Sequence, residues 1–312
     1  MPETPHPKLL DRQAAIKAIS TGYAAQLELL TQLANYASNL GMRAFNSSER
    51  TLRDLIVCHV LLKQFTRMLD ATDLLMRAGA VAAAIVPVRV AFEAAMFAEW
   101  MLVADGDKKA ACYVVGNLRA ARVWTKRAIA GTPETQAFLS DMGQLGDDIR
   151  TGIESLSQAE ASQQLQKLDE SLRGAQFGAV NSAFDQYKAS RRGGEPEWHK
   201  VAGKGNLREI AIELKKLPEY IIFYKQGSDV VHSASYSDHV RVLVRGARAS
   251  PVRDLTGTHN VFNAAASIAI ILFQRILGYY RPQELPRFGQ KYVVEWRQAY
   301  RNIPRARIVE AS

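Results

Sequence analysis

The stretch from Ala80 to Ala104, AVAAAIVPVRVAFEAAMFAEWMLVA, decides the fold class. It is apolar on every side and contains only three charged side chains, Arg89, Glu93 and Glu99. Such a stretch is too long for an ordinary strand, and a helix that is apolar all round belongs in a protein core. The sequence therefore predicts a buried helix here, which Pro87 is expected to kink.

A second apolar stretch, Val261–Leu277, is interrupted by Gln274 and Arg275. This is short of the roughly 20 apolar residues that a membrane span needs, so we expect both stretches to be core helices of a soluble protein. The N-terminus lacks the basic-then-apolar form of a signal peptide. Cys58 and Cys112 are too few for a disulfide scaffold or a four-cysteine zinc site, and free thiols fit a cytoplasmic location.

Almost every other segment has the 3.6-residue period of an amphipathic helix. We expect a first helix from Leu9 to about Leu40, a second that starts at the capping-box pattern of residues 46–49, and a basic connection over residues 241–258. The predicted fold class is all-α, a multi-helix bundle with a protruding polar helical hairpin. We expect a single domain over residues 1–312, with a core at about 50–135 and 206–302 and a polar helical insertion at about 140–190.

The net charge of +9 is unevenly distributed. Residues 1–187 are nearly neutral, and the basic excess lies after them. A basic surface attracts phosphate-bearing partners such as RNA through counterion release, although a modest excess is also typical of a solvated face. With 47% hydrophobic residues the chain can bury a sizeable core, which excludes global disorder.

Two side-chain constellations are candidates for chemistry. Arg89 and Glu93 have the i,i+4 spacing that puts both on one face of the apolar helix. They are either a buried structural ion pair or an arginine that binds an anion and is oriented by its own glutamate.

The second constellation is Tyr224, Ser228 and His232, at i, i+4 and i+8 on one expected helical face. Two hydroxyls and an imidazole in a row can form a hydrogen-bond relay, and His is an acid or base near neutral pH. The plain alternative is a capping serine and a structural or exposed histidine. The sequence has no metal-ligand spacing, no P-loop and no GxGxxG motif, so neither a metal nor a cofactor is predicted.

The order of motifs is more specific than any one of them. The helix with Arg89 and Glu93 is followed, after a long gap, by Trp198-His199 and then by Tyr224-x-x-x-Ser-x-x-x-His232. This arrangement over about residues 50–280 resembles a bacterial all-helical family, domain of unknown function 5677. The resemblance adds Trp198 and His199 as candidate substrate-binding residues.

The helical core and late histidine also resemble, more remotely, the HEPN superfamily. Those proteins are often metal-independent ribonucleases in toxin–antitoxin and antiviral defence systems, with Arg, four to six residues and His as signature. Here Lys225, not Arg, stands seven residues before His232.

The HEPN resemblance implies residue roles for RNA cleavage. His232 would transfer protons and Arg89 or Lys225 would offset phosphate charge. Glu93 would hold Arg89, while Tyr224 and Ser228 would position the imidazole or phosphate.

The competing hypothesis is a non-catalytic helical sensor or scaffold that binds a protein partner, encoded in the same operon, or a small anion. A transferase or hydrolase acting on a phosphorylated metabolite ranks third. Two long apolar helices and an aromatic last helix also favour a homodimer.

Overall fold

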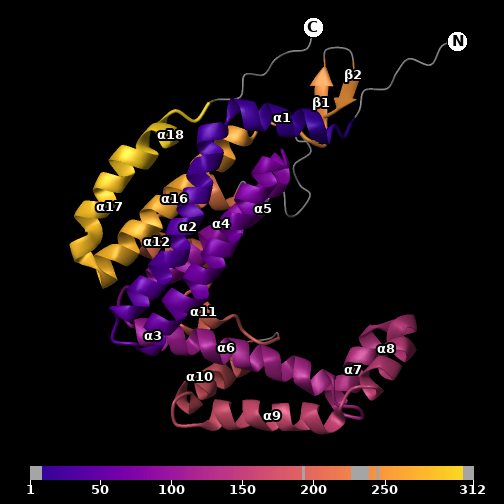
Figure 1. The fold of residues 1–312 in the computed structure, drawn as a ribbon. Helices are drawn as coiled ribbons and strands as arrows, with labels where there is room; N and C mark the ends of the chain where they lie inside the picture. Colours follow the sequence, from indigo (N-terminus) through magenta and orange to yellow (C-terminus); the bar gives the residue numbers. More distant parts are fainter. Residues whose placement is uncertain (1–8, 192–193, 226–238, 244–245, 305–312) are drawn as a thin grey trace, which may run out of the picture. The chain divides into compact units, whose positions relative to one another are not determined.

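The computed structural model describes residues 9–191, 194–225, 239–243 and 246–304 (Figure 1). The chain divides into two compact units. Unit 1 contains residues 1–104 and 207–312, and unit 2 contains residues 105–206.

Unit 1 is built almost entirely from helices. Its N-terminal part contains α1 (Arg12–Gly22), α2 (Ala24–Asn46), α3 (Leu52–Leu55), the π-helix η1 (Ile56–Leu61), α4 (Leu62–Arg77) and α5 (Val81–Met101). After unit 2 the chain returns as α12 (Leu207–Glu213), α13 (Leu217–Glu219), the π-helix η3 (Tyr220–Lys225), β1 (Val240–Leu243), β2 (Gly246–Ala249) and α16 (Thr258–Tyr280). It ends with the 3₁₀ turn η4 (Pro282–Glu284), α17 (Leu285–Lys291), the π-helix η5 (Tyr292–Trp296) and α18 (Arg297–Arg301).

The core of unit 1 forms where four long helices meet. Both α2 and α5 pack against α4 and α16 (Figure 1). The helix α5 is buried around most of its circumference, as its apolar sequence predicts, and Trp100 at its C-terminal end is fully buried. Phe65 of α4 and Phe273 of α16 meet edge to face with ring centroids 6.1 Å apart. Each such side chain contributes about 1.5–3 kcal/mol by leaving water.

A tight turn between α4 and α5 lets α1 pack closely above it. Gly79 has a φ of +66°, which favours glycine, and a Cβ there would lie 2.7 Å from the Cβ of Ala15. Both the backbone conformation and the contact with α1 therefore require glycine.

The last helices of unit 1 are held against α2 by one buried tryptophan. Trp296 is fully buried, and its indole Nε1 donates a hydrogen bond to Gln32 Oε1 at 3.0 Å. Gln26 donates to the carbonyl oxygens of Ala299 and Asn302, which satisfies acceptors at the end of α18. These contacts place α17 and η5 alongside α2.

Unit 2 has a small core of its own. Its elements are α6 (Gly106–Arg127), α7 (Pro133–Asp141), the 3₁₀ turn η2 (Gly143–Leu145), α8 (Gly146–Glu154), α9 (Gln158–Arg173), α10 (Gly178–Ala189) and α11 (Trp198–Val201). The core residues are Cys112, Val115, Leu172 and Phe184, with Trp198 packed against them. Gly116 makes this packing possible, because a Cβ there would lie 2.9 Å from the Cβ of Trp198.

Arg119 of α6 connects the polar elements of unit 2. It is buried and donates hydrogen bonds to Asn181, Asp185 and Glu195 at 2.7–2.8 Å. Its guanidinium also lies over the ring of Phe184. One side chain thus ties α10 and the loop before α11 to α6.

The predicted all-α class is confirmed, since helices dominate the described residues and β1 and β2 are the only strands among them. Three local expectations were wrong. The first helix is broken at Tyr23, and α2 runs through Asn46, so the capping box that starts the next helix is formed by Thr51 and Asp54. The expected connection over residues 241–258 contains part of the antiparallel pair β1–β2.

Two described helices, α5 and α16, are long and apolar enough to cross a membrane by length and composition. However, 56% and 61% of their apolar windows are buried inside the protein. Core helices pass the same test, so the two helices are weak evidence for a membrane.

Candidate functional site

Arg89 and Glu93 lie on the same face of α5, as their spacing predicts. Their side chains form an ion pair with Arg89 Nε 3.5 Å from Glu93 Oε1. Arg89 is the more enclosed, with 15% of its side chain exposed against 33% for Glu93. An arginine this enclosed needs its donors satisfied, because burying an unpaired charge is costly.

Tyr224, on the π-helix η3, is the second partner of Arg89. Arg89 Nη2 donates to the Tyr224 hydroxyl oxygen at 2.9 Å, and the guanidinium carbon lies 4.4 Å from the ring centroid. Tyr220 stacks on Tyr224 at 5.0 Å. Burial raises the pKa of Tyr224, although the Arg89 contact opposes that increase, so the phenol stays protonated at neutral pH. The guanidinium is therefore held by a carboxylate and an aromatic hydroxyl together.

The remaining nitrogen of Arg89 is not satisfied by these contacts. Nη1 is buried and has no hydrogen-bond partner among the residues that the structure describes. A guanidinium carries five N–H donors in a fixed plane, so this atom is free to donate to a further acceptor. A small cavity of about 100 Å³ is lined by Val88 and Phe223, the sequence neighbours of Arg89 and Tyr224.

The structure thus brings together three of the predicted site residues: Arg89, Glu93 and Tyr224. Lys225 ends η3 directly after Tyr224. Ser228 and His232 lie outside the described residues. The proposed relay of Tyr224, Ser228 and His232 stays a prediction.

Trp198 and His199 belong to unit 2. Trp198 contacts Tyr113 edge to face in the core of that unit. His199 is buried, with Nδ1 2.8 Å from the carbonyl oxygen of Lys204 and Nε2 3.4 Å from Glu197. These contacts give both residues a structural role within unit 2, and their predicted part in substrate binding stays a prediction.

A buried ion pair in unit 1, between Lys216 and Glu99, was not predicted from the sequence. Lys216 donates to Glu99 Oε1, and both side chains are more than nine-tenths buried. Burial raises the pKa of Glu99, while the charges of Lys216 and Arg275 oppose that increase. In the sequence, Glu99 is recognisable only as a charged residue in an apolar stretch. Its partner is 117 residues away, so sequence spacing gave no signal.

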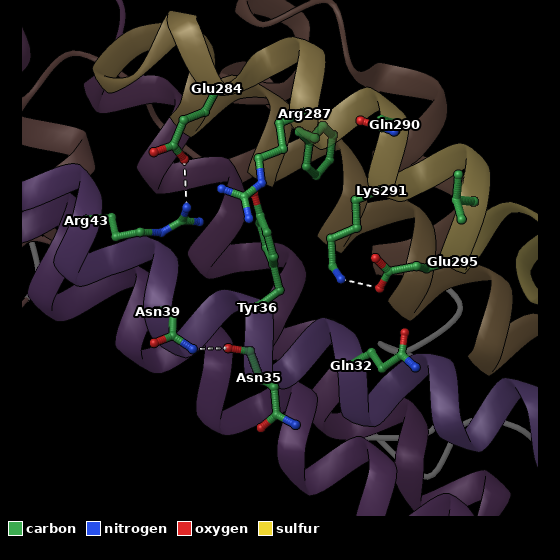
Figure 2. A pocket seen from close by; sticks show the side chains of 12 residues that line it. Gln32, Asn35, Tyr36, Asn39, Arg43, Glu284, Arg287, Gln290, Lys291 and Glu295 are labelled. Carbon is green, nitrogen blue, oxygen red and sulfur yellow. Dashed lines mark hydrogen bonds and ion pairs between the residues drawn. The ribbon is translucent and has the colours of Figure 1, made fainter.

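A large cleft in unit 1 was also not predicted from the sequence. It has a volume of about 670 Å³ and lies between α2 and the α17–η5 segment of unit 1 (Figure 2). Its lining residues are Gln32, Asn35, Tyr36, Asn39, Arg43, Glu284, Arg287, Phe288, Gln290, Lys291, Val294 and Glu295. The polar stripe of α2 was visible in the sequence at helical spacing, but its opposite wall comes from the other end of the chain.

Among the described residues, no three His, Cys, Asp or Glu side chains gather as a metal site. The described residues thus form a predominantly helical protein with an enclosed arginine whose Nη1 has no hydrogen-bond partner among them. The sequence profile of a family of unknown function, DUF5677, matches residues 55–243, which is more than half of the chain. The chain therefore belongs to this family. No curated protein and no solved structure matched the chain.

The matched region contains Arg89, Glu93 and Tyr224, together with Ser228 and His232. It includes none of the residues that line the cleft between α2 and α17–η5. The region around Arg89 and the cleft between α2 and α17–η5 are thus formed by different parts of the sequence.

Proposed function

We propose that the cluster of Arg89, Glu93 and Tyr224 binds a phosphate group of RNA and that the chain is a metal-independent, HEPN-like ribonuclease acting in a toxin or antiviral defence system. The observation that supports this most directly is the buried Nη1 of Arg89, which has no hydrogen-bond partner among the described residues. Guanidinium groups bind phosphate oxygens through charge-assisted hydrogen bonds, which are about twice as strong as neutral ones.

In this proposal each residue has a defined task. Arg89 donates from Nη1 to a non-bridging phosphate oxygen and offsets the charge that develops in the transition state. Glu93 and Tyr224 hold the guanidinium in place through its other nitrogens. His232 removes the proton from the 2′-hydroxyl as that oxygen attacks phosphorus, or gives a proton to the departing 5′-oxygen. Ser228 and Lys225 contact the phosphate.

A non-catalytic sensor or scaffold is the second candidate, and one observation favours it. Glu93 already neutralises the charge of Arg89, and the Arg89–Tyr224 contact joins α5 to η3. A residue pair that only ties helices together has the same appearance. The two candidates differ in what happens when Arg89 or His232 is removed.

The test is an RNA-degradation assay with purified protein, run beside a growth assay in cells that express it. The variants are Arg89→Ala, Arg89→Lys and His232→Ala, with Arg67→Ala as a matched control because Arg67 is exposed on α4. We expect wild type and Arg67→Ala to cleave RNA and slow growth. We expect His232→Ala and Arg89→Ala each to lose at least about 100-fold in rate, the first through loss of a proton-transfer group and the second through loss of a donor that stabilises transition-state charge. Intact RNA and healthy growth with wild type would exclude the ribonuclease and leave the scaffold.

A further inference from the structure

The cleft between α2 and α17–η5 has more positive than negative side chains. Arg43 forms an ion pair with Glu284 at 2.7 Å, and Lys291 pairs with Glu295 (Figure 2). Arg287 is exposed and has no ion-pair or hydrogen-bond partner among the described residues. Three cations therefore share two carboxylates within one cleft, and this imbalance favours an anionic ligand.

Two arginines from opposite walls converge on one tyrosine. The Arg43 guanidinium carbon lies 5.3 Å from the centroid of the Tyr36 ring. Figure 2 shows Arg287 reaching from α17 toward the hydroxyl end of the same ring. The two like charges repel each other, and Glu284 neutralises Arg43 but not Arg287, so a further anion between the two guanidinium groups would be stabilised.

Arg43 has a hydrogen-bond donor that no other described residue satisfies. Arg43 Nε is buried and has no hydrogen-bond partner among the described residues. Burial raises the pKa of Tyr36, and the hydrogen bond from Arg43 and the charges of Arg43 and Arg287 only oppose that increase, so the phenol keeps its proton. Arg43, Arg287 and Tyr36 thus offer donors to one anion from three side chains.

We propose that this cleft is a binding site for a small phosphate monoester of about mononucleotide size, with the phosphate between Arg43 and Arg287 beside the Tyr36 hydroxyl. A phosphate monoester has three terminal oxygens and a charge of about −1.5 to −2 at neutral pH, so it matches three converging donors and an excess of positive charge better than a carboxylate with a single charge. A volume of about 670 Å³ lies within the usual range of small-molecule sites.

The rest of the cleft suits the body of such a ligand. The amides of Asn35 and Gln290 line it and form no side-chain hydrogen bond with other described residues. They can bind hydroxyl groups or the polar edge of a ring. The residues that line the cleft lie outside the region that matches the family, so this site is independent of the RNA-binding proposal.

The test is isothermal titration calorimetry of the full chain with three probes: inorganic phosphate, adenosine 5′-monophosphate and adenosine. The variants are Arg287→Ala and Glu284→Gln. Arg297→Ala is the matched control because Arg297 is exposed on α18 and does not line the cleft. Thermal unfolding checks that each variant is folded.

We expect the monophosphate to bind and adenosine not to bind. Arg287→Ala weakens binding about tenfold, the usual effect of losing a charge-assisted hydrogen bond. Glu284→Gln strengthens it, because a carboxylate that competes for Arg43 is removed, and Arg297→Ala leaves it unchanged. If inorganic phosphate binds with the same response to the variants but the monophosphate does not bind, the position of the phosphate between Arg43 and Arg287 is supported. The proposed contacts to the rest of the ligand are then excluded.

The proposal is overturned if wild type binds neither phosphate nor the monophosphate at millimolar concentration. It is also overturned if Arg287→Ala and Arg297→Ala weaken binding equally, because the attraction then comes from net charge. Both outcomes leave the Arg89 proposal unaffected, since its readouts are RNA cleavage and growth.

Discussion

Replacing Lys216 with methionine tests whether the buried pair with Glu99 stabilises unit 1. Lys216 and Glu99 have 9% and 6% of their side chains exposed. Removing one partner of a buried pair strands the other charge and typically costs about 3–5 kcal/mol. Arg275 lies 3.7 Å from Glu99 but is 64% exposed, so it recovers at most about 1 kcal/mol. We therefore expect Lys216→Met to lower the free energy of unfolding by about 3 kcal/mol.

The assay is urea denaturation followed by circular dichroism, with a double-mutant cycle as its control. The double variant Glu99→Met with Lys216→Met removes both charges and keeps the volume apolar, so it is expected within about 1 kcal/mol of wild type. A loss below about 1 kcal/mol for Lys216→Met, or a double variant as unstable as the single one, would refute the reasoning.

The pH dependence of the destabilisation by Lys216→Met is an independent test of the Lys216–Glu99 pair. Burial raises the pKa of Glu99 in the folded state above its ordinary value. The folded state then holds the Glu99 proton more tightly than the unfolded state, so this group favours folding at low pH and loses that contribution as pH rises through its folded pKa. Removing Lys216 takes away a charge that lowers this pKa. The destabilisation by Lys216→Met is therefore expected to be smaller at pH 5 than at pH 8.

Three further predictions concern packing and reactivity. Gly79→Ala is expected to destabilise unit 1 by about 1–3 kcal/mol in the same denaturation assay, because φ is positive and the new Cβ meets Ala15; an unchanged midpoint contradicts this. Burial raises the pKa of Cys58 to about 12, so iodoacetamide is expected to leave Cys58 unmodified at pH 8 until urea unfolds the chain, which peptide mass spectrometry can check. Arg119→Met is expected to speed limited proteolysis within residues 178–195, whereas Arg150→Met, which changes an exposed arginine, is not.

The fold class was readable from sequence because it depends on local pattern. Residues 80–104 are apolar around the helix except at Arg89, Glu93 and Glu99, and α5 forms there with most of its surface buried. The break at Tyr23 was missed because apolar periodicity continues through it. Residues 46–49 and Thr51–Asp54 carry similar capping patterns, and only the second forms a capping box. Which of two neighbouring signals acts depends on the tertiary packing of α2.

Only the part of the candidate site that depends on local sequence spacing could be predicted. The pairing of Arg89 with Glu93 follows from helical spacing, but the contact with Tyr224 spans 135 residues. In the same way, the Arg43–Glu284 pair joins residues 241 apart. Such contacts are set by how the helices pack, and no spacing in a single sequence encodes them. In addition, Tyr224 lies on a π-helix, where the α-helical period used for its neighbours does not apply.

The central claim is that Arg89 binds a phosphate of RNA. The most direct measurement is the affinity of an RNA oligonucleotide for protein carrying His232→Ala, which under the proposal prevents turnover, with Arg89→Ala, Glu93→Gln or Arg67→Ala added. We predict that Arg89→Ala weakens binding about tenfold, that Glu93→Gln tightens it because the amide still contacts Arg89 but no longer neutralises its charge, and that Arg67→Ala has no effect. Equal affinities for Arg89→Ala and Arg67→Ala would contradict the account.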